Sequence, residues 1–396
     1  MSLPTDLARE VTDRAPEPGF DTVLDRARVG RRRRRTTIAS GLAAAVVVAG
    51  VVALPALDPF GRDRSAPGPA TPGTSEVDPR LPEDVRALLG QEEVYPWTVA
   101  GSGDGVAVLW RSCPGEGLDN PCAFVLTTRR GDEVSGVAVR GDHPRLTAVP
   151  SGWLLETDGS FDIVLAGGDQ PVVDTGPGNA DVMAGDTLVE TDDGFRLLRG
   201  TKAVPPPVPA DSELWAGYMT PEGRLVAVTA RGRDVSASTT DDGRTWESVV
   251  LPREDGPVVS ALVAGSGDHV AVALVGEDRE GYDGLPVVDV RVSDDAGRTW
   301  IPARGLDTTG VDGIGNASSL AVTPSGTAYL TTETHGLVRI DADGNATQAR
   351  LSSHDTSAIV LDDAVCVVAE AGRVDELQCS TDDGTTWSAQ PLPGFS

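Results

Sequence analysis

Four cysteines are the first residues whose spacing suggests chemistry. They fall in two close pairs, Cys113 with Cys122 and Cys366 with Cys379. An even number of cysteines in close pairs favours two local disulfides in an extracytoplasmic protein, because that compartment is oxidising. A thiol-based metal site is the alternative, but neither pair has the C-x-x-C spacing typical of such sites.

The other residues that could act in catalysis or bind a metal form no recognisable motif. The four histidines, His143, His269, His335 and His354, are scattered without the spacing of a metal site. The sequence contains no G-x-S-x-G, P-loop or H-E-x-x-H motif. Residues 341–345 begin like a calcium loop but lack its glycine position and terminal glutamate, so we interpret them as a turn. We therefore predict no catalytic residue, no cofactor and no metal site.

Three eight-residue segments, 239–246, 293–300 and 380–387, match one another as S/T-x-D-x-G-x-T-W. The hydroxyl and the carboxylate of this pattern can accept hydrogen bonds from backbone N–H groups of a turn, and glycine supplies a positive φ. The tryptophan can close the hairpin as an apolar plug. We assign this turn to the following residues: Thr239, Asp241, Gly243, Trp246, Ser293, Asp295, Gly297, Trp300, Ser380, Asp382, Gly384 and Trp387.

These segments resemble the Asp-box, or BNR, repeat of sialidase-like, sortilin-like and related β-propellers. The resemblance covers roughly residues 98–396 and implies an all-β propeller for that part of the chain. In the Asp-box group the box aspartates lie on the rim, away from the central active face. The resemblance therefore assigns the boxes to the fold and not to catalysis.

Sialidases of the Asp-box group bind a sialic acid carboxylate with three arginines, the first in an R-I-P motif, and use a tyrosine backed by a glutamate as the nucleophile. This sequence has no R-I-P motif, and its nearest string begins at Arg339-Ile340. Tyr329, with Glu333 four residues later, mimics at best part of the nucleophilic pair. We predict a protein that is not an enzyme. The alternative is a cell-surface glycoside hydrolase of sialidase-like type with a diverged active site.

Short apolar runs separated by Gly and Asp turns repeat along the chain, which is rich in glycine (46) and proline (29). Such regular short strands predict a propeller or a similar array. The repeats divide into seven units: 98–145, 146–178, 179–209, 212–252, 257–304, 316–351 and 356–393. Their mean length is about 42 residues, the size of a four-stranded blade. We expect one β-propeller of about seven blades, with six or eight as alternatives, and the short second and third units leave the register weakest there.

A membrane anchor is predicted before the repeats. Residues 36–57 carry no charge and are long enough, as a helix, to cross a bilayer core of about 30 Å. The five arginines 31–35 precede this span and should stay on the cytoplasmic side. A cleaved secretory signal is the alternative, but the long leader and the lack of a clear A-x-A site favour the anchor.

The predicted organisation has four parts. Residues 1–35 form a short cytoplasmic segment, 36–57 a transmembrane helix, 58–80 a disordered Pro/Gly/Ser linker, and 81–396 an extracytoplasmic β-propeller. The protein would thus be a single-pass protein of the cell membrane, with its N-terminus in the cytoplasm and in contact with the lipid bilayer through one helix.

The acidic surface limits the class of partner. After residue 80 the chain holds 21 basic and 50 acidic residues, a charge near −29. A field of this sign repels phosphate backbones, so nucleic acid is excluded as a partner. We expect a membrane-tethered, non-enzymatic propeller that binds an envelope protein, a peptide or a glycan.

Overall fold

The fold was analysed in a computed structural model of the 396-residue chain. The structure describes residues 76–91, 94–103, 105–113, 122–141, 143–158, 160–164, 170–174, 180–191, 194–251, 257–277, 286–306, 317–332, 336–349, 358–368 and 376–395. All of them belong to one structural unit, Pro72–Ser396. The predicted cytoplasmic segment and transmembrane helix lie outside the described residues. Within the described part, no helix has the length and apolar character needed to cross a membrane.

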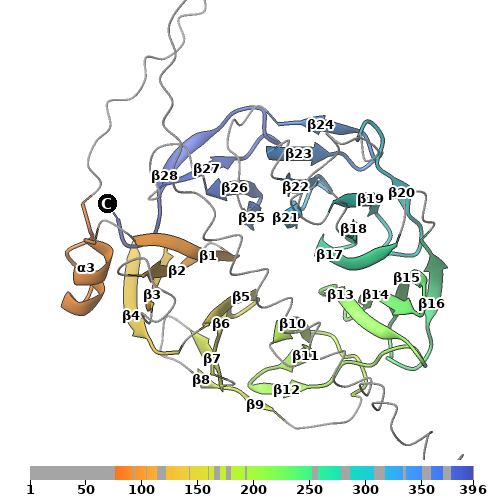
Figure 1. The fold of residues 1–396 in the computed structure, drawn as a ribbon, viewed down its shortest axis with the longest axis horizontal. Coiled ribbons are helices and arrows are strands. Elements are labelled where there is room, and N and C mark those ends of the chain that lie inside the picture. Colours follow the sequence, from red (N-terminus) through yellow and green to blue (C-terminus); the bar gives the residue numbers. More distant parts are fainter. Residues whose placement is uncertain are drawn as a thin grey trace, which may run out of the picture. The chain divides into compact units, whose positions relative to one another are not determined.

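Seven four-stranded sheets, numbered here as blades 1 to 7, surround a common axis (Figure 1). Blade 1 contains β1 (Val94–Ser102), β2 (Gly105–Ser112), β3 (Ala123–Arg130) and β4 (Glu133–Val139). Blade 2 contains β5 (Arg145–Val149), β6 (Gly152–Thr157), β7 (Ser160–Val164) and β8 (Gln170–Pro171). Blade 3 contains β10 (Thr187–Thr191), β11 (Gly194–Arg199), β12 (Lys202–Val204) and β9 (Val173–Asp174).

Blades 4 to 7 each use four consecutive strands. Blade 4 contains β13 (Glu213–Met219), β14 (Leu225–Arg231), β15 (Asp234–Thr240) and β16 (Glu247–Val250). Blade 5 contains β17 (Val258–Ser266), β18 (His269–Gly276), β19 (Val287–Ser293) and β20 (Ile301–Pro302). Blade 6 contains β21 (Ala317–Val322), β22 (Ala328–Thr332), β23 (Gly336–Ile340) and β24 (Ala346–Gln348). Blade 7 contains β25 (Ala358–Leu361), β26 (Ala364–Val368), β27 (Glu376–Ser380) and β28 (Ser388–Pro391).

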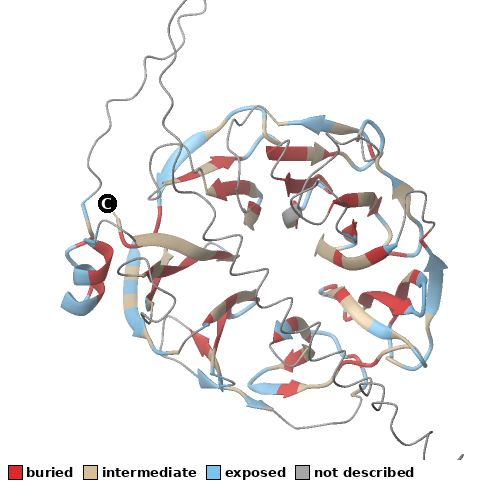
Figure 2. Ribbon diagram, viewed as in Figure 1, coloured by how far each residue is buried: buried red, intermediate tan, exposed pale blue. Residues whose placement is uncertain are grey.

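The position of a strand in its blade explains its composition. Second strands such as β14 and β18 are almost wholly buried, because neighbouring blades cover both of their faces, and they read as continuous apolar runs. Outer strands such as β16 and β28 are exposed along their whole length (Figure 2). Buried apolar clusters therefore span pairs of adjacent blades, as Ala271 of blade 5 and Leu330 of blade 6 illustrate. The core lies between the blades.

The seven-bladed, all-β architecture predicted from the repeats is confirmed, with one change of register. The dipeptide strand β9 was expected in the second unit, but it pairs in parallel with β12 and forms the outer edge of blade 3. The first blade also begins at Val94, a few residues before the predicted boundary. The first difference falls where the apolar pattern is short, so that pairing between strands, and not local sequence, decides the assignment of β9.

Blades 1 and 7 meet without exchanging a strand. β1 lies against β25. Segments from both ends of the unit hold this junction. Val77 pairs with Phe395, and the N–H of Asp78 donates to the carbonyl of Gly394 at 2.9 Å. Helix α3 (Glu83–Leu89) buries its apolar residues in the same cluster as Leu392. We call these two segments, 77–89 and 392–395, the latch.

Consecutive antiparallel strands place two sets of turns on one face of the ring. The turns that join first to second strands and those that join third to fourth strands share this face, because direction alternates at each step. We call it the turn face. The three Trp-containing segments and the Leu361–Ala364 turn of blade 7 all belong to it.

Candidate binding site between the first and last blades

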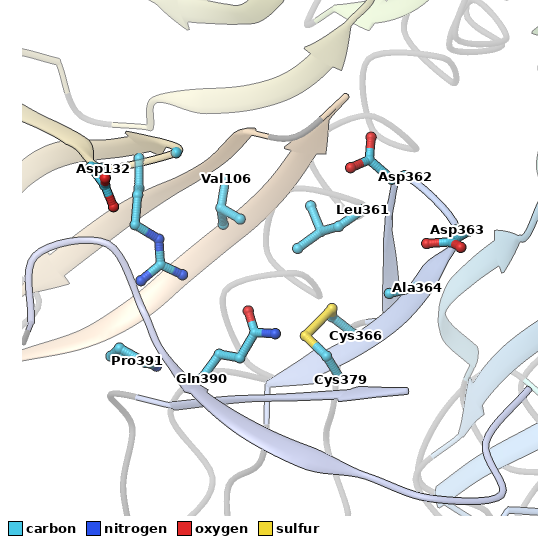
Figure 3. A pocket seen from close by; sticks show the side chains of 12 residues that line it. Val106, Asp132, Leu361, Asp362, Asp363, Ala364, Cys366, Cys379, Gln390 and Pro391 are labelled. Carbon is cyan, nitrogen blue, oxygen red and sulfur yellow. A yellow bond between two sulfur atoms is a disulfide. The ribbon is translucent and has the colours of Figure 1, made fainter. Parts of the chain in front are cut away.

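A cavity of about 580 Å³ opens at the turn face between blades 1 and 7. Figure 3 shows the side chains that line it. Blade 1 contributes Val106, Arg129, Gly131 and Asp132, and blade 7 contributes Leu361, Asp362, Asp363, Ala364, Cys366, Cys379, Gln390 and Pro391. Its volume falls in the range of ligand sites, roughly 300 to 1,000 Å³. We call it the seam pocket.

Arg129 is the unusual residue of the seam pocket. Side chains alternate along β3, so Arg129 shares a face with Val125 and Thr127, which are 1% and 0% exposed and pack toward blade 7. A charge in such a position is normally paired. Arg129 makes no hydrogen bond or ion pair with any of the described residues, and burial lowers the pKa of its guanidinium. The residue therefore offers donors that the described protein does not use.

The rim of the pocket is acidic. Asp132 lies on one side and Asp362 and Asp363 on the other, with Gln390 between them (Figure 3). All three aspartates are exposed. One arginine inside and three carboxylates at the mouth make the local charge negative, which matches the sign of the whole domain.

A disulfide forms part of the pocket wall. Cys366 and Cys379 face each other across β26 and β27 and are bonded, as predicted, and both are buried. The second predicted disulfide, Cys113–Cys122, is also formed. It joins the end of β2 to the start of β3, on the face of the ring opposite the turn face. The Cys366–Cys379 disulfide, together with Val106 and Leu361, gives the pocket an apolar lining that suits a side chain better than a free ion.

The pocket holds no arrangement that would act as a nucleophile and base pair. Its polar side chains are one guanidinium, one amide and three carboxylates. In the described part of the chain, no group of three or more His, Cys, Asp or Glu side chains is placed to hold a metal ion. The pocket is therefore suited to binding a ligand. The Arg129 guanidinium can donate hydrogen bonds inside it, the carboxylates at the rim can accept them, and the wall between them is apolar.

The Trp-containing segments form hydrogen-bonded turns between third and fourth strands. In the third segment, Ser380 Oγ donates to the Asp382 carboxylate at 2.8 Å and accepts the Gly384 N–H at 2.8 Å. The same carboxylate accepts the N–H and the hydroxyl of Thr386, both at 2.8 Å. Ser293, Asp295, Gly297 and Thr299 repeat this pattern in blade 5.

The first segment, 239–246, forms its turn with other residues than predicted. Its hydrogen bonds use Thr240 and Asp242, not Thr239 and Asp241: Thr240 Oγ1 accepts the Gly243 N–H at 2.8 Å, and Asp242 accepts the Thr245 N–H at 2.8 Å. Asp241 instead pairs with Arg224. Thr239 pairs with Glu247 in the ladder, so the turn starts one residue later and is one residue shorter than the other two.

Each turn contacts the blade before its own. A Cβ on Gly297 would lie 2.9 Å from Val226 of blade 4, and a Cβ on Gly384 would lie 3.7 Å from Tyr329 of blade 6. Trp300 packs against the cluster shared by blades 4 and 5, and Trp387 packs against that of blades 6 and 7. The turns therefore act between blades, as plugs.

The residues considered for sialidase chemistry do not assemble. Tyr329 is fully buried between blades 6 and 7, and burial raises its pKa to about 12. Arg339 pairs with Tyr329 across β22 and β23 within that sheet, away from the inner strands. Among the described inner strands, Arg145 is the sole arginine, and it lies 3.5 Å from Glu190. Glu333 lies outside the described residues.

Sequence reasoning missed Arg129. The apolar alternation of β3 puts it on a packing face, and that signal was present in Val125 and Thr127. Its meaning depends on blade 7, which is some 230 residues away in the sequence but adjacent in the ring. A local pattern shows an arginine at a strand end, and such a residue is ordinarily solvated.

Comparisons with known proteins show the fold alone. The chain matches no protein-family model and no curated protein sequence. Among solved structures, it is 13% identical to the β-propeller domain of the Trilobed protease from Pyrococcus furiosus, with a TM-score of 0.46 and coverage of 76% of this chain and 96% of that one. Kuenenia stuttgartiensis hydrazine synthase is 14% identical, with a TM-score of 0.44 and coverage of 77% and 97%. The seven sheets described above, and not these neighbours, define the chain as a seven-bladed β-propeller, whose first and last blades enclose a pocket.

Proposed function

We propose that this protein is a membrane-tethered, non-enzymatic propeller of the Asp-box group that binds a peptide segment of an envelope protein in the seam pocket. The guanidinium of Arg129, which lies on an interblade packing face and has no partner among the described residues, carries this proposal. Holding a half-buried charge there without a partner among the described residues costs some stability, and such a cost is typical of residues kept for binding.

The acidic rim supports a peptide over other ligands. Amide and ammonium groups of a peptide donate hydrogen bonds, and the carboxylates of Asp132, Asp362 and Asp363 can accept them. The strongly negative domain also favours a partner with basic residues near its binding segment. The carboxylates would oppose a phosphate or a nucleic acid at the same place.

The tether supports a partner in the cell envelope. The predicted linker 58–80 overlaps the latch, which begins at Val77 beside the blades that form the pocket, so the proposed helix 36–57 would connect to the latch through the residues before Val77. A truncated chain starting at residue 72 should lose its membrane association while the full chain stays with the membrane fraction. Equal fractionation of the two chains would count against the anchor.

Site-specific photo-crosslinking in intact cells tests the binding function. We would place p-benzoylphenylalanine at Gln390, an exposed residue of β28 that lines the pocket, and, as a control, at the exposed Val250 of blade 4. The proposal expects a crosslinked peptide of one envelope protein from position 390, lost in an Arg129→Gln background and absent from position 250. Crosslinks that do not depend on Arg129, or no crosslink at all, would refute it.

Turnover assays test the alternative function. The purified full chain should not hydrolyse chromogenic sialosides or β-glucosides, because Tyr329 is buried. Hydrolysis that survives the Arg129→Gln substitution would replace the binding proposal with a glycoside hydrolase whose site lies elsewhere. A glycan recovered from position 390 in place of a peptide would overturn the peptide assignment.

A further inference from the structure

Strand register makes Arg129 the counterpart of the box serines. Two-residue turns join the first and second strands of blades 1, 5 and 7, closed by the pairs Ser102–Gly105, Ser266–His269 and Leu361–Ala364. In each blade the next residue of the second strand is a valine. These valines pair with Arg129, Ser293 and Ser380 respectively. The three residues therefore occupy one structural position.

The segment after this position differs between the blades. In blades 5 and 7 six residues loop out, and the chain returns at Trp300 or Trp387, because the next ladder pairs are Val292–Ile301 and Cys379–Ser388. In blade 1 the chain turns at once, and Arg129 pairs directly with Val134. Valine thus replaces tryptophan, and a two-residue turn that contains Gly131 replaces the six-residue loop.

The seam pocket lies where the missing turn would be. The box turn of blade 7 packs on blade 6 beside Tyr329, whose ladder partner is Arg339. The corresponding wall of blade 7 is the Cys366–Cys379 pair, which lines the seam pocket from the other side. A tryptophan side chain buries roughly 150 to 250 Å² in such a place. At the junction of blades 7 and 1, no tryptophan of such a turn fills the corresponding space.

We propose that the seam pocket accepts an aromatic side chain with a neighbouring carboxylate, supplied by the partner peptide in place of the missing turn. The ring would take the position that Trp387 holds in blade 7. The carboxylate would bind the guanidinium of Arg129, as the box aspartate binds the box serine. This inference uses the site named in the proposed function and adds the chemistry that the site selects.

The rim restricts the rest of the ligand. Asp132, Asp362 and Asp363 surround the mouth, so a second carboxylate outside the pocket would be repelled and a basic or neutral residue accepted. The selected segment therefore has one carboxylate next to its aromatic residue, with neutral or basic residues further outward.

Two small probes that differ by one charge test this chemistry. N-acetyltryptophan carries the indole and a carboxylate, and N-acetyltryptophanamide carries the indole alone. With the full chain in detergent, ligand-observed NMR should show the acid binding about 10- to 100-fold more tightly than the amide, because one charge-assisted contact is lost. Arg129→Gln should reduce the acid to the affinity of the amide.

Matched controls separate the pocket from the general surface. Arg231→Gln removes an equal charge from an exposed ion pair of blade 4 and should leave both affinities unchanged. N-acetylleucine should bind at least about tenfold more weakly than N-acetyltryptophan, because its side chain leaves most of the cavity empty. Equal binding of acid and amide, or acid binding that Arg129→Gln leaves intact, would overturn the proposal.

A graft tests the missing turn without any ligand. Residues 129–134 would be replaced by the octapeptide of residues 293–300, which spans the same ladder positions. A folded graft with native-like circular dichroism should show a higher melting temperature and no binding of N-acetyltryptophan. A folded graft that still binds the probe would refute the assignment, and the Arg129→Gln measurement decides the matter if the graft fails to fold.

The two proposals can fail separately. Arg129-dependent binding of N-acetyltryptophan without any crosslink at position 390 would refute the envelope partner but keep the pocket chemistry. Crosslinks at position 390 with equal binding of acid and amide would keep the partner and refute the chemistry.

Discussion

Arg129 and the aspartates of the Trp-containing turns are charged residues near blade junctions, but they differ in their hydrogen bonding. The Asp382 carboxylate receives three hydrogen bonds within its own turn from Ser380 and Thr386. Arg129, at the position equivalent to Ser380, receives no such partner among the described residues. Charged groups near an interface are stable when their hydrogen bonds are complete. Ser380 thus stabilises the turn of blade 7, while Arg129, at the equivalent position of blade 1, remains available to bind a ligand.

Replacing Arg129 with an apolar residue of similar length should stabilise the protein. Arg129→Met removes a charge that has no partner among the described residues and keeps most of the side-chain packing, so the free energy of unfolding should rise by about 0.5 to 1 kcal/mol. Urea unfolding of the full chain in detergent measures this change, with Arg231→Met as the control. A decrease of more than about 1 kcal/mol would mean that Arg129 has a stabilising partner.

The carboxylates of the Trp-containing turns should make the stability of the protein depend on pH in the acid range. Backbone hydrogen bonds from Thr245 and Arg244 lower the pKa of Asp242 to about 2. A lowered folded pKa gives stability that is present above the unfolded value, about 4, and is lost as the pH falls toward 2. Asp242→Asn should therefore be less stable than the wild type at pH 6, and the difference should vanish near pH 2.

The measurement is the denaturant midpoint of both proteins between pH 6 and pH 2. Asp294→Asn removes the same charge from an exposed residue outside these hydrogen bonds and serves as the control. A difference between wild type and Asp242→Asn that stays constant over this range would exclude the carboxylate as its cause.

At the scale of the element, the turn of blade 4 shows that one motif can form in two registers. The string Thr239-Thr240-Asp241-Asp242 offers two hydroxyls and two carboxylates at the same spacing. The strand ladder selects the later pair, because Thr239 is already paired with Glu247. The earlier pair takes other contacts: Asp241 binds Arg224, and Thr239 lies under Gly297 of the next blade.

The two threonines should respond differently to the same substitution. Thr240→Val removes the hydroxyl that accepts the Gly243 N–H and should cost about 1 to 3 kcal/mol of unfolding free energy. Thr239→Val keeps the methyl contact with the next blade and should change it by less than about 0.5 kcal/mol. Thermal or urea unfolding compares them, and a larger loss for Thr239→Val would restore the earlier register.

At the scale of the whole molecule, the latch replaces strand exchange in closing the ring. Trp110 of blade 1 packs edge-on against Phe395 with ring centroids 5.2 Å apart. Its indole N–H donates to Thr127 Oγ1 at 2.7 Å, and that hydroxyl donates to the carbonyl of Pro393 at 2.8 Å. The last residues of the chain are therefore tied to blade 1, beside the pocket.

Truncating the aromatic residue of the latch should weaken the closure. Phe395→Ala should lower the unfolding free energy by about 2 to 4 kcal/mol, because it empties a site packed on Trp110, and Phe395→Leu should lower it by less. Hydrogen exchange in α3 should also quicken in Phe395→Ala. An unchanged melting temperature together with unchanged exchange in α3 would show that the latch does not close the ring.

The architecture could be predicted from local sequence patterns, but the seam pocket could not. Seven repeats, the two disulfides and the turn at residues 341–345 are each contained in a stretch of neighbouring residues, where alternation and turn chemistry act directly. The register of β9 and of the Trp-containing turn of blade 4 depends on ladder pairing, which single-segment patterns do not define.

By itself, the sequence determined the all-β class, a ring of about seven blades and most of its hairpins, because these rest on contacts close along the chain. Only the tertiary structure decided that blade 1 meets blade 7, that the turn present in blades 5 and 7 is missing at that junction, and that Arg129 faces the resulting cavity. Closure joins the two ends of the repeat array. The chemistry of the seam pocket therefore depends on residues that are far apart in the sequence and come together only when the ring forms.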